Sequence, residues 1–282
     1  DLAAAGAAPL AFSMGLICPP DMGEDWLRPL FRGMAALADE HRLVLSGGDI
    51  SAGDKLGFCL TIWGRRAGPE RFLRRGALPG QTIFAVGPSC APPKTPGCSL
   101  GLARLGLLLL EERGREAEAE YPAACSALLR PRPQIEAAAV LAGLAHTPED
   151  IFLMDVSDGL MRDLPRLLGG GRAKPDAPDA PGAELNLDAA LLHPELRAFA
   201  HRAAKGVEDE TQKIMLEFAL TGGDDYLLLG AAKAELIPQI RAGLPKHSSL
   251  TPLGQVEPTP GLRRQGRPLE EVLRTRAFDH FS

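Results

Sequence analysis

Two carboxylates and a hydroxyl lie close together where a predicted strand gives way to a helix. The segment Asp155-Val-Ser-Asp-Gly159 follows an apolar run at residues 151–154 and precedes a helical pattern of leucines. Asp155 and Asp158 cannot both be buried as bare anions, because desolvating a carboxylate is costly unless cations or donors compensate it. Mg²⁺ prefers such oxygen ligands and could also hold nucleotide phosphates. In the structural alternative, Asp158 caps the helix and Asp155 faces water.

Glycine-flanked acids occur at two further places. Gly47-Gly-Asp49 follows a predicted strand at residues 43–45, and Gly222-Gly-Asp-Asp-Tyr226 precedes another at 227–229. Glycines let the backbone approach a ligand while the carboxylate projects from the strand end, although a plain turn explains Gly47-Gly48 equally well. If these acidic segments converge, they form a carboxylate cage for several Mg²⁺ ions. Such a cage suits phosphoryl transfer, which depends mainly on positioning and charge neutralisation, and we assign no catalytic base.

Other phosphate-binding features of the sequence are weaker. The spacing of Gly48 and Gly53 is that of a P-loop, but Asp54-Lys55 follows where that motif requires Lys and then Ser or Thr. Arg74, in a basic segment, could bind phosphate in a bidentate manner. Ser99 is expected to cap a helix whose N-terminus could contact an anion. The sequence contains no GxSxG or HExxH motif.

Strands and helices alternate along the chain. Apolar periodicity predicts strands near 10–17, 56–63, 83–86, 184–188 and 253–256, and helices near 21–41, 99–114, 133–145, 160–168, 194–204, 208–220 and 234–244. The 282 residues suffice for two ordinary domains. A net charge of −5 without a Lys/Arg cluster argues against nucleic-acid binding. No apolar run is long enough for a membrane span, and five cysteines without a CxxC pair are typical of reduced thiols in the cytoplasm.

The acidic motifs recur in the order found in a known family. They are, along the chain, Gly47-Gly-Asp-Ile-Ser51, Asp155-Val-Ser-Asp-Gly-Leu160, Gly222-Gly-Asp-Asp-Tyr226 and the terminal Phe278-Asp-His-Phe281. Together they resemble thiamine-monophosphate kinase, of the superfamily that contains aminoimidazole ribonucleotide synthetase and selenophosphate synthetase. The opening Asp1-Leu-Ala-Ala-Ala-Gly6 is similar to the family's SDLAAMGA segment, so the resemblance extends over essentially the whole chain.

The resemblance implies an α+β fold of two domains with mixed sheets flanked by helices. Residues 1–67 would form an ATP- and Mg²⁺-binding domain that dimerises through its sheet, and residues 68–282 a second α+β domain. The γ-phosphate of ATP would pass directly to thiamine monophosphate and give thiamine diphosphate. The implied Mg²⁺ ligands are Asp1, Asp49 and Asp155, with Asp158 on a further metal. Implied ATP contacts are Gly48, Asp49, Arg74 and Ser157, and implied substrate contacts are Asp224 and Phe278.

The sequence also departs from the family pattern. The family's acidic GDDAA and VDT motifs are absent, and because the chain opens without Met or a helix cap we expect that an N-terminal segment precedes it. Where the family has GGEDYEL, this chain has Gly222-Gly-Asp-Asp-Tyr-Leu-Leu228. Asp224 is one methylene shorter than the family's Glu, and Leu227 replaces the family's second Glu. The family's glycine-rich segment after residues 83–86 is rich in proline here. The alternatives to a kinase are therefore a ligase-type ATPase of the same superfamily and a non-catalytic nucleotide-binding scaffold.

Overall fold

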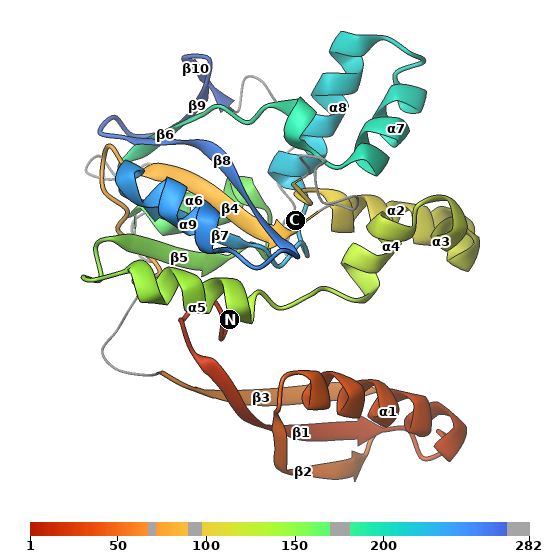
Figure 1. The fold of residues 1–282 in the computed structure, drawn as a ribbon. Coiled ribbons are helices and arrows are strands. Elements are labelled where there is room, and N and C mark those ends of the chain that lie inside the picture. The colour runs from red at the N-terminus through yellow and green to blue at the C-terminus, as the bar shows by residue number, and fades with distance from the viewer. Residues whose placement is uncertain (67–71, 90–97, 170–180, 270–282) are drawn as a thin grey trace. The chain divides into compact units, whose positions relative to one another are not determined.

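A computed structural model describes residues 1–66, 72–89, 98–169 and 181–269 of the chain (Figure 1). The chain divides into two compact units. The N-terminal unit comprises Leu2 and Ala7–Pro69, and the C-terminal unit comprises Asp1, Ala3–Gly6 and Glu70–Ser282. Both units contain a mixed sheet flanked by helix, which confirms the predicted α+β class.

The N-terminal unit is a three-stranded sheet with one helix packed along it (Figure 1). Its elements are β1 (Ala8–Cys18), α1 (Glu24–Glu40), β2 (Val44–Ala52) and β3 (Gly57–Arg65). The strand order is β2-β1-β3, with β1 parallel to β2 and antiparallel to β3. Alternate residues of β1 form a small core with the apolar side of α1, made of Met14, Leu16, Cys18, Leu27, Phe31 and Met34.

The opposite face of this sheet carries exposed apolar side chains. Ile17 lies between Leu16 and Cys18 in β1 and therefore points away from α1, as strand alternation requires. Trp63 and Val44 both pair with Ala11, so they share that face. Their exposed fractions are 49% for Ile17, 44% for Trp63 and 63% for Val44. Large apolar residues exposed together on one sheet face are typical of an interaction surface.

The position of the Gly47-Gly-Asp49 motif differs from the prediction. We expected these residues at a strand end, but they lie within β2, where Gly48 pairs with Met14 and Asp49 pairs with Gly15. A Cβ atom at Gly48 would collide with the carbonyl oxygen of Met14. The glycine thus permits close approach of two strands, so the turn interpretation was also wrong.

The C-terminal unit is built on a seven-stranded sheet of order β10-β9-β6-β8-β4-β7-β5. Its strands are β4 (Thr82–Pro88), β5 (Ile151–Asp155), β6 (Gly182–Leu185), β7 (Leu228–Ala232), β8 (Ser248–Glu257), β9 (Leu262–Arg264) and β10 (Arg267–Pro268). Neighbouring strands pair antiparallel, except that β6 and β9 are parallel.

Helices cover both faces of this sheet. They are α2 (Leu102–Arg113), α3 (Ala117–Glu120), α4 (Pro122–Leu129), α5 (Ile135–Leu144), α6 (Leu160–Gly169), α7 (Pro194–Ala203), α8 (Glu208–Thr221) and α9 (Ile237–Gly243), with short 3₁₀ turns at Gly114–Glu116, Ala189–Leu191 and Ala234–Leu236. Ile83 and Ala85 of β4 join a core with α2, α6 and α8. Phe84 and Val86, which point to the other face, pack with α5 and α9. No helix within the described ranges is long and apolar enough to cross a bilayer.

Candidate functional site

Two of the acidic motifs lie side by side in the C-terminal unit. Strands β5 and β7 pair antiparallel, with Asp155 opposite Leu228, and the pairing continues into the loops beyond the strands. The Tyr226 backbone N–H donates to the carbonyl of Val156 at 2.9 Å, and that of Asp224 donates to Ser157 at 2.9 Å. The sheet therefore brings the segment Asp155–Gly159 against Gly222–Tyr226, two of the segments that we expected to converge.

Glycines allow this close contact between the two loops. Gly159 has φ +94°, and a Cβ there would lie 2.9 Å from the carbonyl oxygen of Gly222. A Cβ at Gly223 would lie 2.8 Å from the Ser157 carbonyl oxygen. Asp224 and Tyr226 both adopt left-handed conformations, with φ of 63° and 49°. Because left-handed non-glycine residues carry strain, the loop is held in a conformation that its own sequence disfavours.

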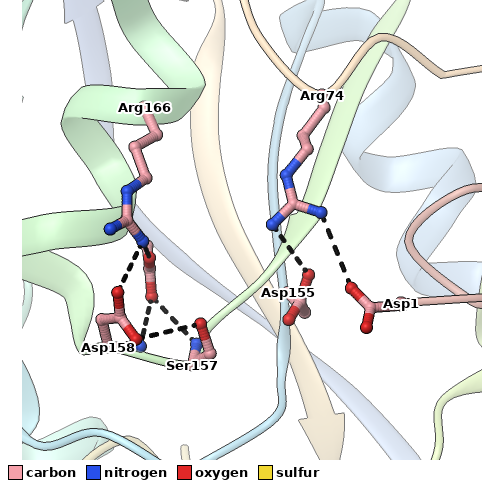
Figure 2. A network of polar contacts seen from close by, with 7 residues as sticks. Asp1, Arg74, Asp155, Ser157, Asp158 and Arg166 are labelled. Carbon is pink, nitrogen blue, oxygen red and sulfur yellow. Dashed lines mark hydrogen bonds and ion pairs between the residues drawn. The ribbon is translucent and has the colours of Figure 1, made fainter. Parts of the chain in front are cut away.

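Asp155, at the end of β5, is the most buried carboxylate that we predicted for the site. Only 8% of its surface is exposed, so the alternative in which it faces water is wrong. Arg74 lies between two acids, 3.5 Å from Oδ1 of Asp155 and 3.6 Å from Oδ1 of Asp1 (Figure 2). Oδ1 of Asp155 is buried and accepts no hydrogen bond. Within the described part of the chain, the cation at this oxygen is Arg74, which is 57% exposed and forms a long ion pair.

Asp158 belongs to a second, separate network, in which Arg166 of α6 is the cation (Figure 2). One guanidinium nitrogen of Arg166 lies 2.8 Å from Asp158 and 2.6 Å from Asp163. Asp163 is fully buried, and its Oδ2 accepts the backbone N–H groups of Ser157 and Asp158, both at 2.9 Å. Asp163 thus holds the Ser157–Asp158 backbone, while the Asp158 carboxylate faces Arg166 and the Ser157 hydroxyl.

The electrostatics of this second network follow from burial and the shared arginine. Burial raises the pKa of Asp163 above its ordinary value, although two backbone N–H donors and Arg166 oppose the change. Burial also acts to raise the pKa of Asp158, but the hydrogen bond and charge of Arg166 outweigh it and lower that pKa overall. The pKa of Arg166 is raised: burial opposes the charged form, and both carboxylates stabilise it.

Asp225 has a structural role that the sequence did not reveal. Its buried carboxylate accepts the backbone N–H groups of Gly101 at 2.6 Å and Ala103 at 3.1 Å, at the start of α2. Burial raises the pKa of Asp225 to about 7 against these hydrogen bonds. The predicted cap, Ser99, instead has a buried hydroxyl without a hydrogen-bond partner. Because Asp225 already occupies this N-terminus, the predicted anion contact there is wrong as well.

Tyr226 and Arg104 complete the surroundings of the glycine-rich loop. The Tyr226 hydroxyl donates to Oδ1 of Asp224 at 3.2 Å. Burial raises the pKa of Tyr226, and the charges of Asp224, Asp155 and Asp158 raise it further. Arg104 stacks on the Phe218 ring at 4.8 Å and donates to the hydroxyl of Thr221, directly before Gly222.

The remaining predicted site residues lie elsewhere in the chain. Gly48 and Asp49 belong to β2 of the N-terminal unit, where the Ser51 hydroxyl donates to Asp49 at 2.8 Å. Their meeting with Asp155 therefore stays a prediction. Phe278 lies outside the described residues. Among the residues that the structure describes, no three His, Cys, Asp or Glu side chains group closely enough to hold a metal ion, so the Mg²⁺ ligand set also stays a prediction.

Sequence reasoning missed Asp163, Arg166 and Asp225. A usable signal existed for Asp163, because it falls on the apolar side of its helix with Leu160, Leu164 and Leu167. A carboxylate on the apolar side of a helix is almost never fully buried unless it is paired with another polar group. Asp225 gave no comparable signal, because its partners Gly101 and Ala103 are remote in sequence.

Comparisons with known proteins agree with the fold. Residues 1–65 match the family model described as AIR synthase related protein, N-terminal domain. A thiamine-monophosphate kinase of Corynebacterium glutamicum is 28% identical over 235 residues, which cover 81% of this chain and 60% of that protein. The crystal structure of thiamine-monophosphate kinase from Stenotrophomonas maltophilia K279a superposes with a TM-score of 0.73 at 28% identity, covering 95% of this chain and 75% of the other. The AaThiL complex with AMPPCP and TMP has a TM-score of 0.73 at 25% identity and covers 100% and 76%.

Residues 1–65 are thus similar to AIR synthase related proteins, and the chain shares the fold of a solved thiamine-monophosphate kinase. In sequence and in fold the chain resembles thiamine-monophosphate kinases. It spans about 60% of the length of the Corynebacterium relative.

Proposed function

We propose that the protein transfers the γ-phosphate of ATP to thiamine monophosphate, with Mg²⁺, and forms thiamine diphosphate. The observation that carries this proposal is the hydrogen-bonded pair of loops, which joins the segment that contains Asp155 and Ser157 to the segment that contains Asp224. The first two residues are expected to contact metal and nucleotide, and Asp224 is expected to contact the substrate. The related AaThiL was crystallised with AMPPCP and TMP, so the two ligand types of the reaction are found together on a protein of this fold.

The donor chemistry at Asp155 fits a divalent cation. Its Oδ1 is buried without a hydrogen-bond partner, and such an oxygen is stabilised by a hard cation that prefers oxygen ligands. We propose that Asp1, Asp155 and, from the N-terminal unit, Asp49 hold Mg²⁺. When bound, the ion would neutralise charge on the transferring phosphate. Asp158, which the resemblance places on a further metal, is already paired with Arg166.

The residues of the chain itself would orient the two reactants. Arg74 is half-exposed and reaches Asp155 only at 3.5 Å, so it can turn to a phosphate without losing a hydrogen bond to that carboxylate. Tyr226 fixes the Asp224 carboxylate through its hydroxyl. We propose that Asp224 contacts thiamine monophosphate, together with Phe278, and that Gly48 and Ser157 contact ATP. Transfer between two phosphate groups needs no dedicated base, because the acceptor oxygen is already ionised.

The departures from the family motif do not favour the scaffold alternative. Leu227, which replaces the family's second acid, is 1% exposed and belongs to the large core of the C-terminal unit. A buried leucine at this position adds packing and does not face the loop surface. The replacement of the family's acid by Leu227 therefore changes the core and not the loop surface. Asp224 still presents a carboxylate next to Tyr226.

We further propose a homodimer that forms through the N-terminal sheet. Ile17, Val44 and Trp63 expose an apolar face on the side away from α1, as a dimer surface would require. A cytoplasmic location remains a prediction from the cysteine pattern alone.

The product of the reaction tests the proposed function. The full-length protein is incubated with ATP and Mg²⁺, and separately with thiamine monophosphate or formylglycinamidine ribonucleotide as acceptor. Thiamine diphosphate formed only with the first acceptor supports the kinase. Turnover only with the second supports the ligase-type ATPase, and nucleotide binding without turnover supports the scaffold.

A further inference from the structure

The Asp158–Arg166–Asp163 network is more tightly bonded than the contacts of Asp155. Arg166 approaches its carboxylates at 2.8 and 2.6 Å, whereas Arg74 approaches Asp155 and Asp1 at 3.5 and 3.6 Å. The short contacts have hydrogen-bond lengths for charged groups, and the long ones do not. Figure 2 shows the two groups apart: Arg166 contacts Asp158, and Arg74 contacts Asp155 and Asp1.

Burial makes the Arg166 contacts hard to exchange. Asp163 is fully buried, so removing its cation would leave an uncompensated charge inside the unit. Its other oxygen is already used by the backbone N–H groups of Ser157 and Asp158. Arg166 is therefore held in place by Asp163, and from that position its guanidinium also reaches Asp158.

Protein donors stabilise both acids of this network, whose net formal charge is −1, without a metal ion at Asp158. The network contains two carboxylates, one guanidinium and two backbone N–H donors that point at Asp163. The Ser157 hydroxyl adds a weaker contact of 3.4 Å to the other oxygen of Asp158. By contrast, the buried Oδ1 of Asp155 accepts no hydrogen bond.

We propose that Arg166 is the resident counter-cation of Asp158, so that this carboxylate recruits no divalent cation while Arg166 is in place. Arg166 is then a positioning residue: it fixes Asp158 and, through Asp163, the Ser157 backbone. The inference rests on the proposed function, in which Asp155 is the acid that faces Mg²⁺, and it departs from the metal role that the resemblance implies for Asp158.

Mn²⁺ binding tests this inference without using turnover. Free Mn²⁺ is counted by electron paramagnetic resonance during titration of the full-length protein in the presence of AMPPCP. Asp158→Asn is expected to leave the number and affinity of Mn²⁺ sites unchanged. Arg166→Gln is expected to create a further Mn²⁺ site, or to tighten binding about tenfold, and the double variant Arg166→Gln/Asp158→Asn to lose this gain.

Two further variants control for structural damage. Arg166→Lys keeps the positive charge and is expected to bind Mn²⁺ as the unchanged protein does. Arg197→Gln removes an arginine of matched exposure, 44% against 45%, whose ion pair with Glu208 lies on the surface, and it is expected to change nothing. Thermal unfolding of every variant shows whether the fold persists.

The outcomes separate this inference from the proposed function. A Mn²⁺ site lost in Asp158→Asn alone would overturn the inference, as would a folded Arg166→Gln protein that gains no Mn²⁺ affinity. Thiamine diphosphate is measured on the same preparations. If it forms while Mn²⁺ binding depends on Asp158, only the role of Arg166 is wrong; if the unchanged protein forms none, the proposed function itself is wrong.

Discussion

The backbone N–H of Asp224 donates to the carbonyl oxygen of Ser157 at 2.9 Å. This hydrogen bond joins two loops that are distant in sequence but follow paired strands of one sheet, β5 and β7. It places a residue expected to contact the acceptor beside a residue expected to contact the nucleotide. The two loops start from paired residues, Asp155 and Leu228, so the pairing of the strands brings them together.

The contact between the loops depends on Gly223. In Gly223→Ala, the new Cβ would lie 2.8 Å from the Ser157 carbonyl oxygen and would push the loops apart. We expect a loss of about 1–3 kcal/mol in the free energy of unfolding and a raised KM for thiamine monophosphate. Denaturant titration and steady-state kinetics measure these effects.

Gly143→Ala is the matched control for that change. Gly143 lies in α5, and a Cβ there meets nothing within 4 Å. Alanine in a helix should leave stability unchanged or increase it by up to about 1 kcal/mol. Equal effects of the two substitutions would show that the loops are not in close contact.

Asp225 should make stability depend on pH. Its pKa is raised from 3.8 to about 7 in the folded protein because burial opposes ionisation. The folded state therefore holds a proton that the unfolded state has released, and the stability from protonated Asp225 is lost as pH rises from about 4 through about 7. Asn cannot ionise, so Asp225→Asn should remove this part of the pH dependence.

The measurement for Asp225 is denaturant unfolding at pH 5 and pH 8. From the lower to the higher pH, the unchanged protein should lose free energy of unfolding relative to Asp225→Asn. Parallel pH profiles of the two proteins would mean that Asp225 does not change its protonation in this range.

Arg74 should contribute more to ATP binding than to stability. Its ion pairs with Asp1 and Asp155 are long and its side chain is 57% exposed to water, so we expect each pair to contribute only about 0–1 kcal/mol. We expect Arg74→Ala to raise the KM for ATP about tenfold or more while the melting temperature stays nearly constant. Arg75→Ala, at an exposed neighbouring position, is the control and should change neither quantity. A large drop in melting temperature with normal KM would assign Arg74 a purely structural role.

The exposed face of the N-terminal sheet should control assembly. Trp63 is 44% exposed on the side away from α1. A carboxylate in the middle of a dimer interface would be desolvated without a partner, so Trp63→Glu should give monomers. Sedimentation velocity measures the change. Leu107→Glu, at a 42% exposed site of α2, is the control and should sediment as the unchanged protein does. Dimers of unchanged affinity in Trp63→Glu would place the interface elsewhere.

Sequence patterns predicted the regular elements well where periodicity was strong. The strands at 10–17, 83–86 and 151–154 and the helices around 21–41 and 208–220 correspond to β1, β4, β5, α1 and α8. The helix α4 and the strands β9 and β10 were not predicted. The first is rich in alanine, which weakens its apolar periodicity, and the last two are only three and two residues long.

The site was predictable in its residue types but not in its pairing. The motif around Asp155 follows a strand as expected, and its burial follows from the fully buried strand that ends there. The partners Arg166 and Asp163 depend on how α6 turns back over the loop, and Asp225 depends on a helix remote in sequence. The predicted position of Asp49 at a strand end was wrong for a local reason. The two glycines before it are typical of a turn, but Gly48 instead allows β2 to lie close to Met14 of β1.

The turnover number of Asp155→Asn tests the central claim most directly. Asn is nearly isosteric with Asp but lacks the charge of the buried oxygen that accepts no hydrogen bond. With thiamine monophosphate and saturating ATP and Mg²⁺, we expect kcat to fall about 100-fold or more while the melting temperature is retained. A folded Asp155→Asn protein that forms thiamine diphosphate at the original rate would contradict the role of these paired acidic loops in phosphoryl transfer.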